Sequence, residues 1–335
     1  GDKVSGGDRL NFALGAYSFV EHGTERNESS LIFATNIPPF GPVAFGAVNP
    51  FAYNTTTKSW AVYGQASYTP HILNDNLRLT GGLRYSADEK ETTLFSSRTV
   101  FVPPANYAKE KFNAVTYLAK AQYFFTQDLN VYVSHSKGYK AGGFNTRSAN
   151  LEAFKPETLK SYEVGAKASW FDRRLQTNLA AFFNKAQDQQ VSEFVAGPTG
   201  AVSVVTNAGQ SEYTGFEFEI IAKPIEGVTF DWNMGFVNPE YKKYETRDPS
   251  TLLPFDASKV ARFGYTSQTT GAAGIQYDSK PIVSMRNGSL QARIEAVWQS
   301  KQDFHPAITY PSGAQDNPLI DATTSDARTL FNARI

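Results

Sequence analysis

The stretch "YEVGAKASW" (residues 162–170) alternates strictly between two kinds of side chain. Apolar residues occupy one series of positions, and polar or small residues occupy the other: Tyr162, Val164, Ala166, Ala168 and Trp170 against Glu163, Gly165, Lys167 and Ser169. Successive side chains of a β-strand point to opposite faces of its sheet. The stretch therefore predicts a strand with one apolar face and one polar face.

The same alternation recurs along most of the chain, for example at 77–85, 228–236 and 290–298. Read in this way, the sequence predicts an all-β fold of about twelve strands. We expect them near 9–22, 58–69, 75–89, 111–125, 129–138, 158–170, 175–189, 204–222, 228–241, 265–278, 289–302 and 327–335. No stretch reaches the roughly 18 consecutive apolar residues of a membrane-spanning helix.

Three features favour a transmembrane barrel over a soluble antiparallel sheet, which is the alternative that alternation alone leaves open. The predicted strands exceed the ~5–6 residues usual in globular proteins. Aromatic residues collect toward strand ends, as in the girdles of membrane barrels: Tyr68, Tyr85, Tyr123, Tyr162, Trp170 and Trp298. Short turns (69–76, 125–128, 171–174, 223–227) alternate with long segments (23–57, 90–110, 139–157, 190–203, 242–264, 303–326). Short turns at one rim and long loops at the other are typical of such barrels.

Composition argues against several other functions. The 32 basic residues balance 32 acidic ones, so no attraction to nucleic acid is expected. The chain has no cysteine, and its four histidines lie outside metal-binding spacings. Glu217 and Glu219 share one strand face and could resemble a glycosidase pair, but a polar lumen explains them without further assumption. We expect no enzyme, no metal site and no cofactor.

Several segments resemble a known family. They are "SWAVYGQASYTP" (59–70), "LRLTGGLRYSADEKE" (77–91), "LNVYVSHSKGYKAGGFN" (129–145), the Asn-Ala-Gly at 207–209 and the Gly-x-Glu-x-Glu signature at 215–219. Each motif alone is loose, but their order and spacing resemble the barrel strands of TonB-dependent outer-membrane receptors over about residues 9–335.

This resemblance implies a 22-stranded transmembrane antiparallel β-barrel whose lumen holds an N-terminal plug domain. Neither a plug nor a TonB box precedes residue 9, and the family's final strands do not follow Ile335. We therefore expect residues 1–335 to be a partial barrel domain, about twelve strands of the 22, without the plug.

The resemblance also implies a function and a location. Such receptors lie in the outer membrane of Gram-negative bacteria and import scarce solutes, mostly iron–siderophore complexes, with energy relayed by TonB. The expected partners are the TonB complex, through the missing plug domain, together with outer-membrane lipid and a small-molecule solute. Iron would enter only as part of the transported ligand. The alternative is a passive channel or a structural barrel without energy coupling.

Charged residues within the predicted spans lie on the polar series. Arg or Lys facing lipid at the membrane midplane would cost ~2–4 kcal/mol. We therefore expect these side chains to face the lumen and to form ion pairs between neighbouring strands. They include Arg78, Arg84, Lys167, Glu217 and Glu219, as well as Lys120, Glu163, Asp231, Arg293 and Glu295.

The long loops are the expected place for solute capture. Segment 32–57 is rich in Phe, Pro and Asn, and its prolines should keep it from forming a strand. Aromatic rings on loops can stack on a flat ligand, and basic groups can attract an anionic iron complex. The candidate ligand contacts are Phe40, Phe45, Tyr53, Phe144 and Arg147. The alternative is that these aromatic rings pack the loops against one another.

Overall fold

The structure is a computed structural model of the 335-residue chain. It describes all residues except 1–8, 38–40, 95–106, 147–150, 198–199, 208, 249, 252, 281–287, 305–307 and 314–323.

One antiparallel sheet dominates the fold. Twelve strands follow one another in chain order across it. They are β1 (Leu10–Ile37), β2 (Gly41–Tyr68), β3 (Leu77–Leu94), β4 (Tyr107–Phe124), β5 (Leu129–Lys140), β8 (Glu157–Trp170), β9 (Leu175–Gln187), β12 (Gly209–Ala222), β13 (Val228–Arg247), β15 (Thr269–Asp278), β16 (Gln291–Gln299) and β19 (Arg328–Arg334). A short strand, β14 (Pro254–Asp256), pairs with the end of β13. The predicted fold class is confirmed, and each predicted strand corresponds to one of these twelve, although the bounds of several differ.

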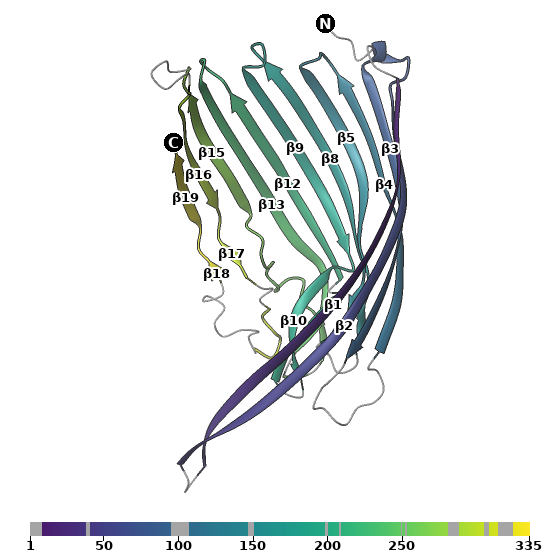
Figure 1. Cartoon of the computed structure of the whole chain (residues 1–335), viewed down its shortest axis with the longest axis vertical. Helices are drawn as coiled ribbons and strands as arrows, with labels where there is room; N and C mark the ends of the chain where they lie inside the picture. Colours follow the sequence, from purple (N-terminus) through teal and green to yellow (C-terminus); the bar gives the residue numbers. More distant parts are fainter. Residues whose placement is uncertain are drawn as a thin grey trace.

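From β2 onward, the connections between strands of the main sheet alternate in length as predicted. Short turns join β4 to β5, β8 to β9 and β12 to β13, and the turn between β2 and β3 holds the 3₁₀ helix η2 (Leu73–Asp75). These turns gather at the upper end of the sheet in Figure 1, whereas the long connections gather at the lower end. The edge strands β1 and β19 do not pair with each other over their described residues, so the barrel is not closed.

The predicted loop at 23–57 is wrong. Strands β1 and β2 continue through most of it as a long hairpin that extends beyond the rest of the sheet (Figure 1). The prolines do not prevent this because β2 pairs with β3 only from Tyr53 to Tyr68. Pro42 and Pro50 therefore lie where β2 has one neighbour, and a missing N–H is tolerated at such an edge.

The predicted loop at 190–203 is also wrong, and so is the single strand at 204–222. A separate hairpin forms from β10 (Gln190–Gly197) and β11 (Gly200–Asn207). β12 begins only at Gly209, whose φ of +123° interrupts the extended backbone. Other long connections carry small pairs of their own: β6 (Gly143–Phe144) with β7 (Ala153–Phe154), and β17 (Gln302–Asp303) with β18 (Thr324–Ser325).

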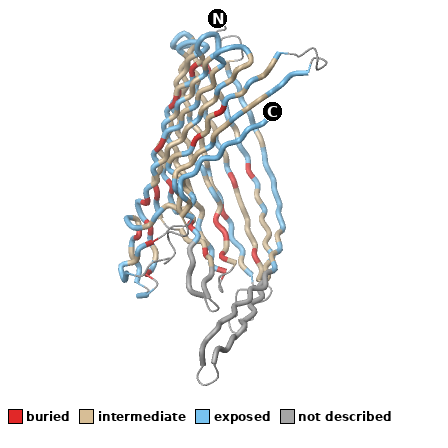
Figure 2. Tube along the Cα trace, turned by 90° about the vertical axis from the view of Figure 1, so that its left-hand side faces the viewer, coloured by how far each residue is buried: buried red, intermediate tan, exposed pale blue. Residues whose placement is uncertain are grey.

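The two faces of the sheet differ in exposure. Large apolar side chains of one series are open to the surroundings, such as Leu14 at 77% and Leu83 at 64% exposed. Among the residues whose burial is described, the buried ones are scattered along the strands and do not gather in a central core (Figure 2). The described hydrophobic cluster lies at the long-connection end: Val191, Tyr241, Tyr244, Ala257 and Ile308. None of the helices in the described ranges is long and apolar enough to cross a membrane.

Glycine allows large side chains to lie flat on the polar face. Gly165 of β8 is directly opposite Tyr132 of β5, and the tyrosine ring covers it. A Cβ atom at Gly165 would lie 2.6 Å from the ring. The buried Tyr132 hydroxyl donates a hydrogen bond of 2.6 Å to Glu163. A side chain at residue 165 would therefore displace the ring and weaken this bond.

We expect Gly165→Ala to lower the free energy of unfolding by about 1–3 kcal/mol, as overpacking does elsewhere. Urea unfolding of the full-length protein in lipid vesicles measures this change. Gly81→Ala is the matched control, because a Cβ there meets nothing within 4 Å. Equal losses for the two variants would contradict the role given to the Tyr132 ring.

Candidate functional site

The polar face carries a connected group of side chains over β4, β5 and β8. Lys120 Nζ lies 4.3 Å from the centroid of the Tyr132 ring, a cation–π contact. The same tyrosine donates its hydroxyl hydrogen to Glu163. Each residue belongs to the polar series of its strand, and the register places Lys120 opposite Ser134, which in turn lies opposite Glu163.

A second group spans β13, β15 and β16. Arg293 Nη2 lies 3.0 Å from Asp231 Oδ2, and the same nitrogen lies 3.1 Å from Glu295 Oε2. Asp231 and Arg293 belong to strands separated by β15, where Gly274 lies opposite Asp231. Because Gly274 has no side chain, the guanidinium can cross β15 and reach the carboxylate. This ion pair between strands agrees with the pairing expected from the sequence.

The five candidate lumen charges all lie on the polar series, opposite the exposed apolar side chains. Arg84 donates a hydrogen bond of 2.9 Å to Ser86, and Arg78 lies over the Phe124 ring. Glu219 accepts a hydrogen bond of 2.8 Å from Asn178. Lys167 and Glu217 are exposed. Among the ion pairs of the described residues, none joins two of these five.

At the long-connection end, aromatic rings pack against one another. Tyr241 stacks on Phe263 with ring centroids 3.8 Å apart, and Tyr213 contacts the same Phe263 edge-on at 5.6 Å. Phe255 and Tyr310 form a similar edge contact. The geometry therefore shows these rings packing against one another. This is the alternative to ligand contact that the sequence left open for aromatic residues in loops.

Two aspartates, Asp248 and Asp256, accept hydrogen bonds from backbone N–H groups at the long-connection end of the sheet. Burial acts to raise the pKa of Asp248, but hydrogen bonds from Ser312, Ser250 and Thr251 outweigh it, so the pKa is lowered. The backbone N–H of Tyr244 donates to Asp256 at 3.0 Å and lowers the pKa of that carboxyl group. Both carboxylates therefore act as anchors of the connections.

The candidate ligand contacts are not brought together. Phe40 and Arg147 lie outside the described residues, and Phe45 lies in β2 without a described side chain. Tyr53 lies in the β1–β2 hairpin, where its hydroxyl donates to Glu25 at 2.5 Å. Phe144 is half-buried in the small β6–β7 sheet. The two described candidates therefore belong to different sheets.

Sequence reasoning missed the residues that fix the connections near Phe144. The side chain of Asn145 is bonded to both backbone groups of Val205, at 2.7 and 2.9 Å. Asn207 bonds both backbone groups of Lys155 and also the carbonyl of Asp188. The Asn-Ala-Gly motif at 207–209 is the sequence feature that could have pointed to Asn207. Over the described ranges, no group of three or more His, Asp or Glu could hold a metal ion.

The Asp231–Arg293 pair allows a quantitative test. In a double-mutant cycle with Asp231→Asn and Arg293→Gln, we expect a coupling energy of about 1–3 kcal/mol, because the contact is bidentate and largely shielded from solvent. Glu226 and Lys280, 3.0 Å apart but highly exposed, serve as the control and should show little coupling. Unfolding of the four variants in vesicles gives both values, and equal coupling in the two pairs would contradict the shielded geometry.

Comparisons with known proteins identify the family that shares this architecture. A family model described as "TonB dependent receptor-like, beta-barrel" matches residues 4–335. The chain is similar to the pesticin receptor of Yersinia enterocolitica, at 27% identity over 226 residues, which cover 67% of this chain and 32% of that protein. It is also similar to the catecholate siderophore receptor Fiu of Escherichia coli, at 25% identity, with 70% of this chain and 33% of that protein covered.

Solved structures show the same fold. The ferric yersiniabactin uptake receptor FyuA from Yersinia pestis superimposes with a TM-score of 0.67 at 19% identity, over 98% of this chain and 43% of that one. The siderophore receptor PiuA from Acinetobacter baumannii gives a TM-score of 0.62 at 16% identity, over 98% and 47%. The chain spans about a third of the two curated relatives named above. From the family match over nearly its whole length, the chain belongs to the TonB-dependent receptor β-barrel family.

Proposed function

We propose that this chain is part of an outer-membrane receptor that binds a scarce solute outside the cell and imports it with energy relayed by TonB. The favoured solute is an iron–siderophore complex. We also propose that residues 1–335 are a portion of a 22-stranded barrel that works together with a plug domain. Its location would then be the outer membrane of a Gram-negative bacterium, with lipid around it.

The separation of the two sheet faces is the observation that carries this proposal. Exposed apolar side chains on one face suit contact with lipid. The opposite face carries the Lys120–Tyr132–Glu163 and Asp231–Arg293–Glu295 groups, and it would line the lumen. A lumen with fixed charges suits contact with a polar plug and a polar solute. Arg78, Arg84, Lys167, Glu217 and Glu219 would share that lining.

The names of the relatives support the choice of solute class. Similar proteins carry names such as pesticin receptor and catecholate siderophore receptor. At the long-connection end, Phe144 offers a ring whose backbone neighbour Asn145 is anchored. Tyr53 remains a proposed contact. The same is proposed for three residues whose side chains the structure does not describe: Phe40, Phe45 and Arg147. We propose solute transport for this chain, with no catalytic step.

Energy coupling is tested by uptake. Cells carrying the full-length gene should accumulate a radiolabelled iron–siderophore complex, and deletion of TonB should reduce uptake to the level of the receptor deletion. Growth of the receptor-deletion strain on a panel of iron sources and carbohydrates should identify the solute class. Uptake that persists without TonB would instead support a passive channel.

Phe144 is tested by binding. We expect Phe144→Ala to weaken solute affinity by about 2- to 12-fold, the range of one lost aromatic contact of ~0.5–1.5 kcal/mol. Phe171→Ala is the matched control, since Phe171 lies in the β8–β9 turn at the opposite end. Titration of the purified full-length protein, followed by tryptophan fluorescence, measures both affinities. Unchanged affinity for Phe144→Ala would remove this residue from the proposed site.

A further inference from the structure

Two asparagines join two connections that are far apart in the sequence. Asn145 lies in the connection between β5 and β8, and its side chain bonds the backbone of Val205 in β11. Asn207 ends β11, and its side chain bonds the backbone of Lys155 in the first connection. Each connection therefore holds the backbone of the other. We call these two contacts, Asn145 with Val205 and Asn207 with Lys155, the reciprocal clamps.

Each clamp matches an amide side chain to a whole peptide unit. Asn145 Oδ1 accepts from the Val205 N–H at 2.7 Å, and Asn145 Nδ2 donates to the Val205 carbonyl oxygen at 2.9 Å. Asn207 repeats this geometry with Lys155, at 2.7 and 2.9 Å. An asparagine amide both donates and accepts, whereas an ionised aspartate only accepts and an alanine side chain does neither. The clamps therefore depend on the amide group itself.

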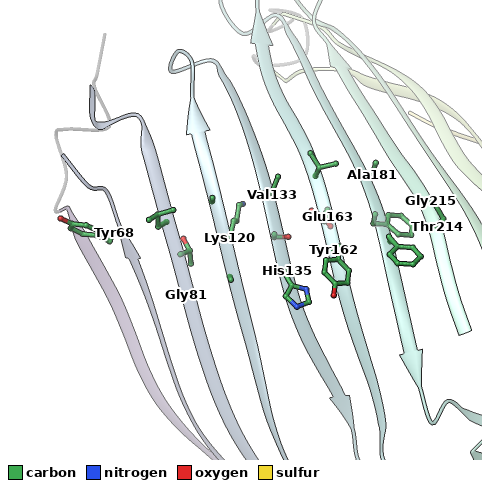
Figure 3. Close-up of a pocket in the computed structure, with 18 of the residues that line it drawn as sticks. Tyr68, Gly81, Lys120, Val133, His135, Tyr162, Glu163, Ala181, Thr214 and Gly215 are labelled. Atoms are coloured by element: carbon green, nitrogen blue, oxygen red, sulfur yellow. The ribbon is translucent and has the colours of Figure 1, made fainter. Parts of the chain in front are cut away.

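The β10–β11 hairpin depends on such contacts because it forms a two-stranded sheet of its own. Within the main sheet, strand pairing alone brings side chains together. His135 of β5 is directly opposite Tyr162 of β8, and their rings stack at 4.3 Å (Figure 3). An isolated two-stranded hairpin is marginally stable in water. The position of this hairpin on the molecule therefore depends on side-chain contacts at its base.

The base of the hairpin is also held at its first strand. Gln190 begins β10, and its Nε2 donates to the carbonyl oxygens of Ala141 and Lys155, at 2.9 and 3.1 Å. The backbone N–H of Gln190 donates to Glu157 at 2.9 Å. The Lys155 carbonyl oxygen thus accepts from both Gln190 of β10 and Asn207 of β11. Both strands of the hairpin are therefore joined to the β5–β8 connection.

The first clamp acts on the residue that follows Phe144. Asn145 is buried, and its backbone N–H donates to the Glu152 carbonyl oxygen at 2.8 Å. Phe144 itself pairs with Ala153 across the small β6–β7 sheet. With its backbone bound to Glu152 and its side chain bound to Val205, Asn145 fixes the direction of the chain at Phe144. The placement of the Phe144 ring therefore depends on a contact with β11.

We propose that Asn145 and Asn207 are positioning residues for solute binding. The reciprocal clamps make the β10–β11 hairpin and the β5–β8 connection one unit, which presents Phe144 at a fixed place. The hairpin is then a fixed wall of the binding site and not a lid that moves on its own. Contacts that are held in place before binding lose less conformational entropy when the solute arrives. The proposal rests on the solute-binding role proposed above for Phe144.

Hydrogen–deuterium exchange tests the joined connections without any solute. The N–H groups of Val205 and Lys155 donate to the two asparagines, so these amides report on the clamps. In the full-length protein in detergent, we expect Asn145→Ala to speed exchange about tenfold or more at both amides, because one unit opens as a whole. Asn207→Ala should have the same effect at both. Faster exchange only at the amide whose own partner was removed would overturn the proposal.

Solute affinity tests the positioning role, with an iron–catecholate siderophore complex as the probe. We expect Asn145→Ala to weaken binding by about 3- to 10-fold, because Phe144 is no longer held in place. Asn238→Ala is the matched control, since this exposed asparagine bonds Glu240 of its own strand. It should change neither the exchange rates nor the affinity. Equal weakening by the two variants would contradict a role for the clamp.

Asn145→Asp separates positioning from a loss of stability. Its ionised carboxylate can accept from the Val205 N–H but cannot donate to the Val205 carbonyl oxygen, whereas the protonated carboxyl group can do both. Burial and the facing carbonyl should hold the pKa of this carboxyl group above its ordinary value of about 3.9. Affinity and Val205 protection should therefore recover together as the pH is lowered from about 7 to about 5.

All values for Asn145→Asp are expressed relative to the wild type at the same pH. This ratio cancels the titration of the probe and of the nearby Glu152, Glu157 and Asp188, which both proteins contain. Recovery of Val205 protection without recovery of affinity would overturn the positioning role. If the wild type does not bind the probe but both amides respond to either substitution, the proposed solute is wrong and the joined connections stand. Independent amides together with TonB-dependent uptake would count against the clamps alone.

Discussion

An unpaired backbone N–H or C=O group in hydrocarbon costs several kcal/mol, and the rest of this structure depends on avoiding that cost. The strand ladder from β1 to β19 pairs these groups continuously across the sheet. A ladder of this kind gives every strand two faces with a period of two residues. One face can then meet lipid while the other meets a polar interior, within the same stretch of chain.

Side chains on the polar face depend on the glycines between them. Tyr132 covers Gly165, and Arg293 reaches Asp231 across Gly274. Each contact joins residues that are far apart in the sequence but close in register. Charged and aromatic groups can therefore be held in fixed positions on a sheet without a central hydrophobic core. At the long-connection end, stacked aromatic rings and anchored aspartates provide the corresponding order.

The apolar face also carries charged residues toward the long-connection end of the sheet. The arrangement of charge differs between strands. Glu89 lies between Lys58 and Lys111 across β2 to β4. Lys137, Lys160 and Lys185, in contrast, lie directly opposite one another across β5, β8 and β9. In the proposed receptor, the same barrel wall would separate a side that faces lipid from a side that faces the path of the solute.

Alternation within segments such as 162–170 was enough to predict twelve strands, their two faces and the side on which the short turns lie, because the period of a strand is a local property. The β1–β2 hairpin and the β10–β11 hairpin were not predictable, since strand length in a connection depends on whether a neighbouring strand pairs there. Three lysines on β5, β8 and β9 illustrate the same limit. Sequence places Lys137, Lys160 and Lys185 on three strands, but only the register of the folded sheet places them opposite one another.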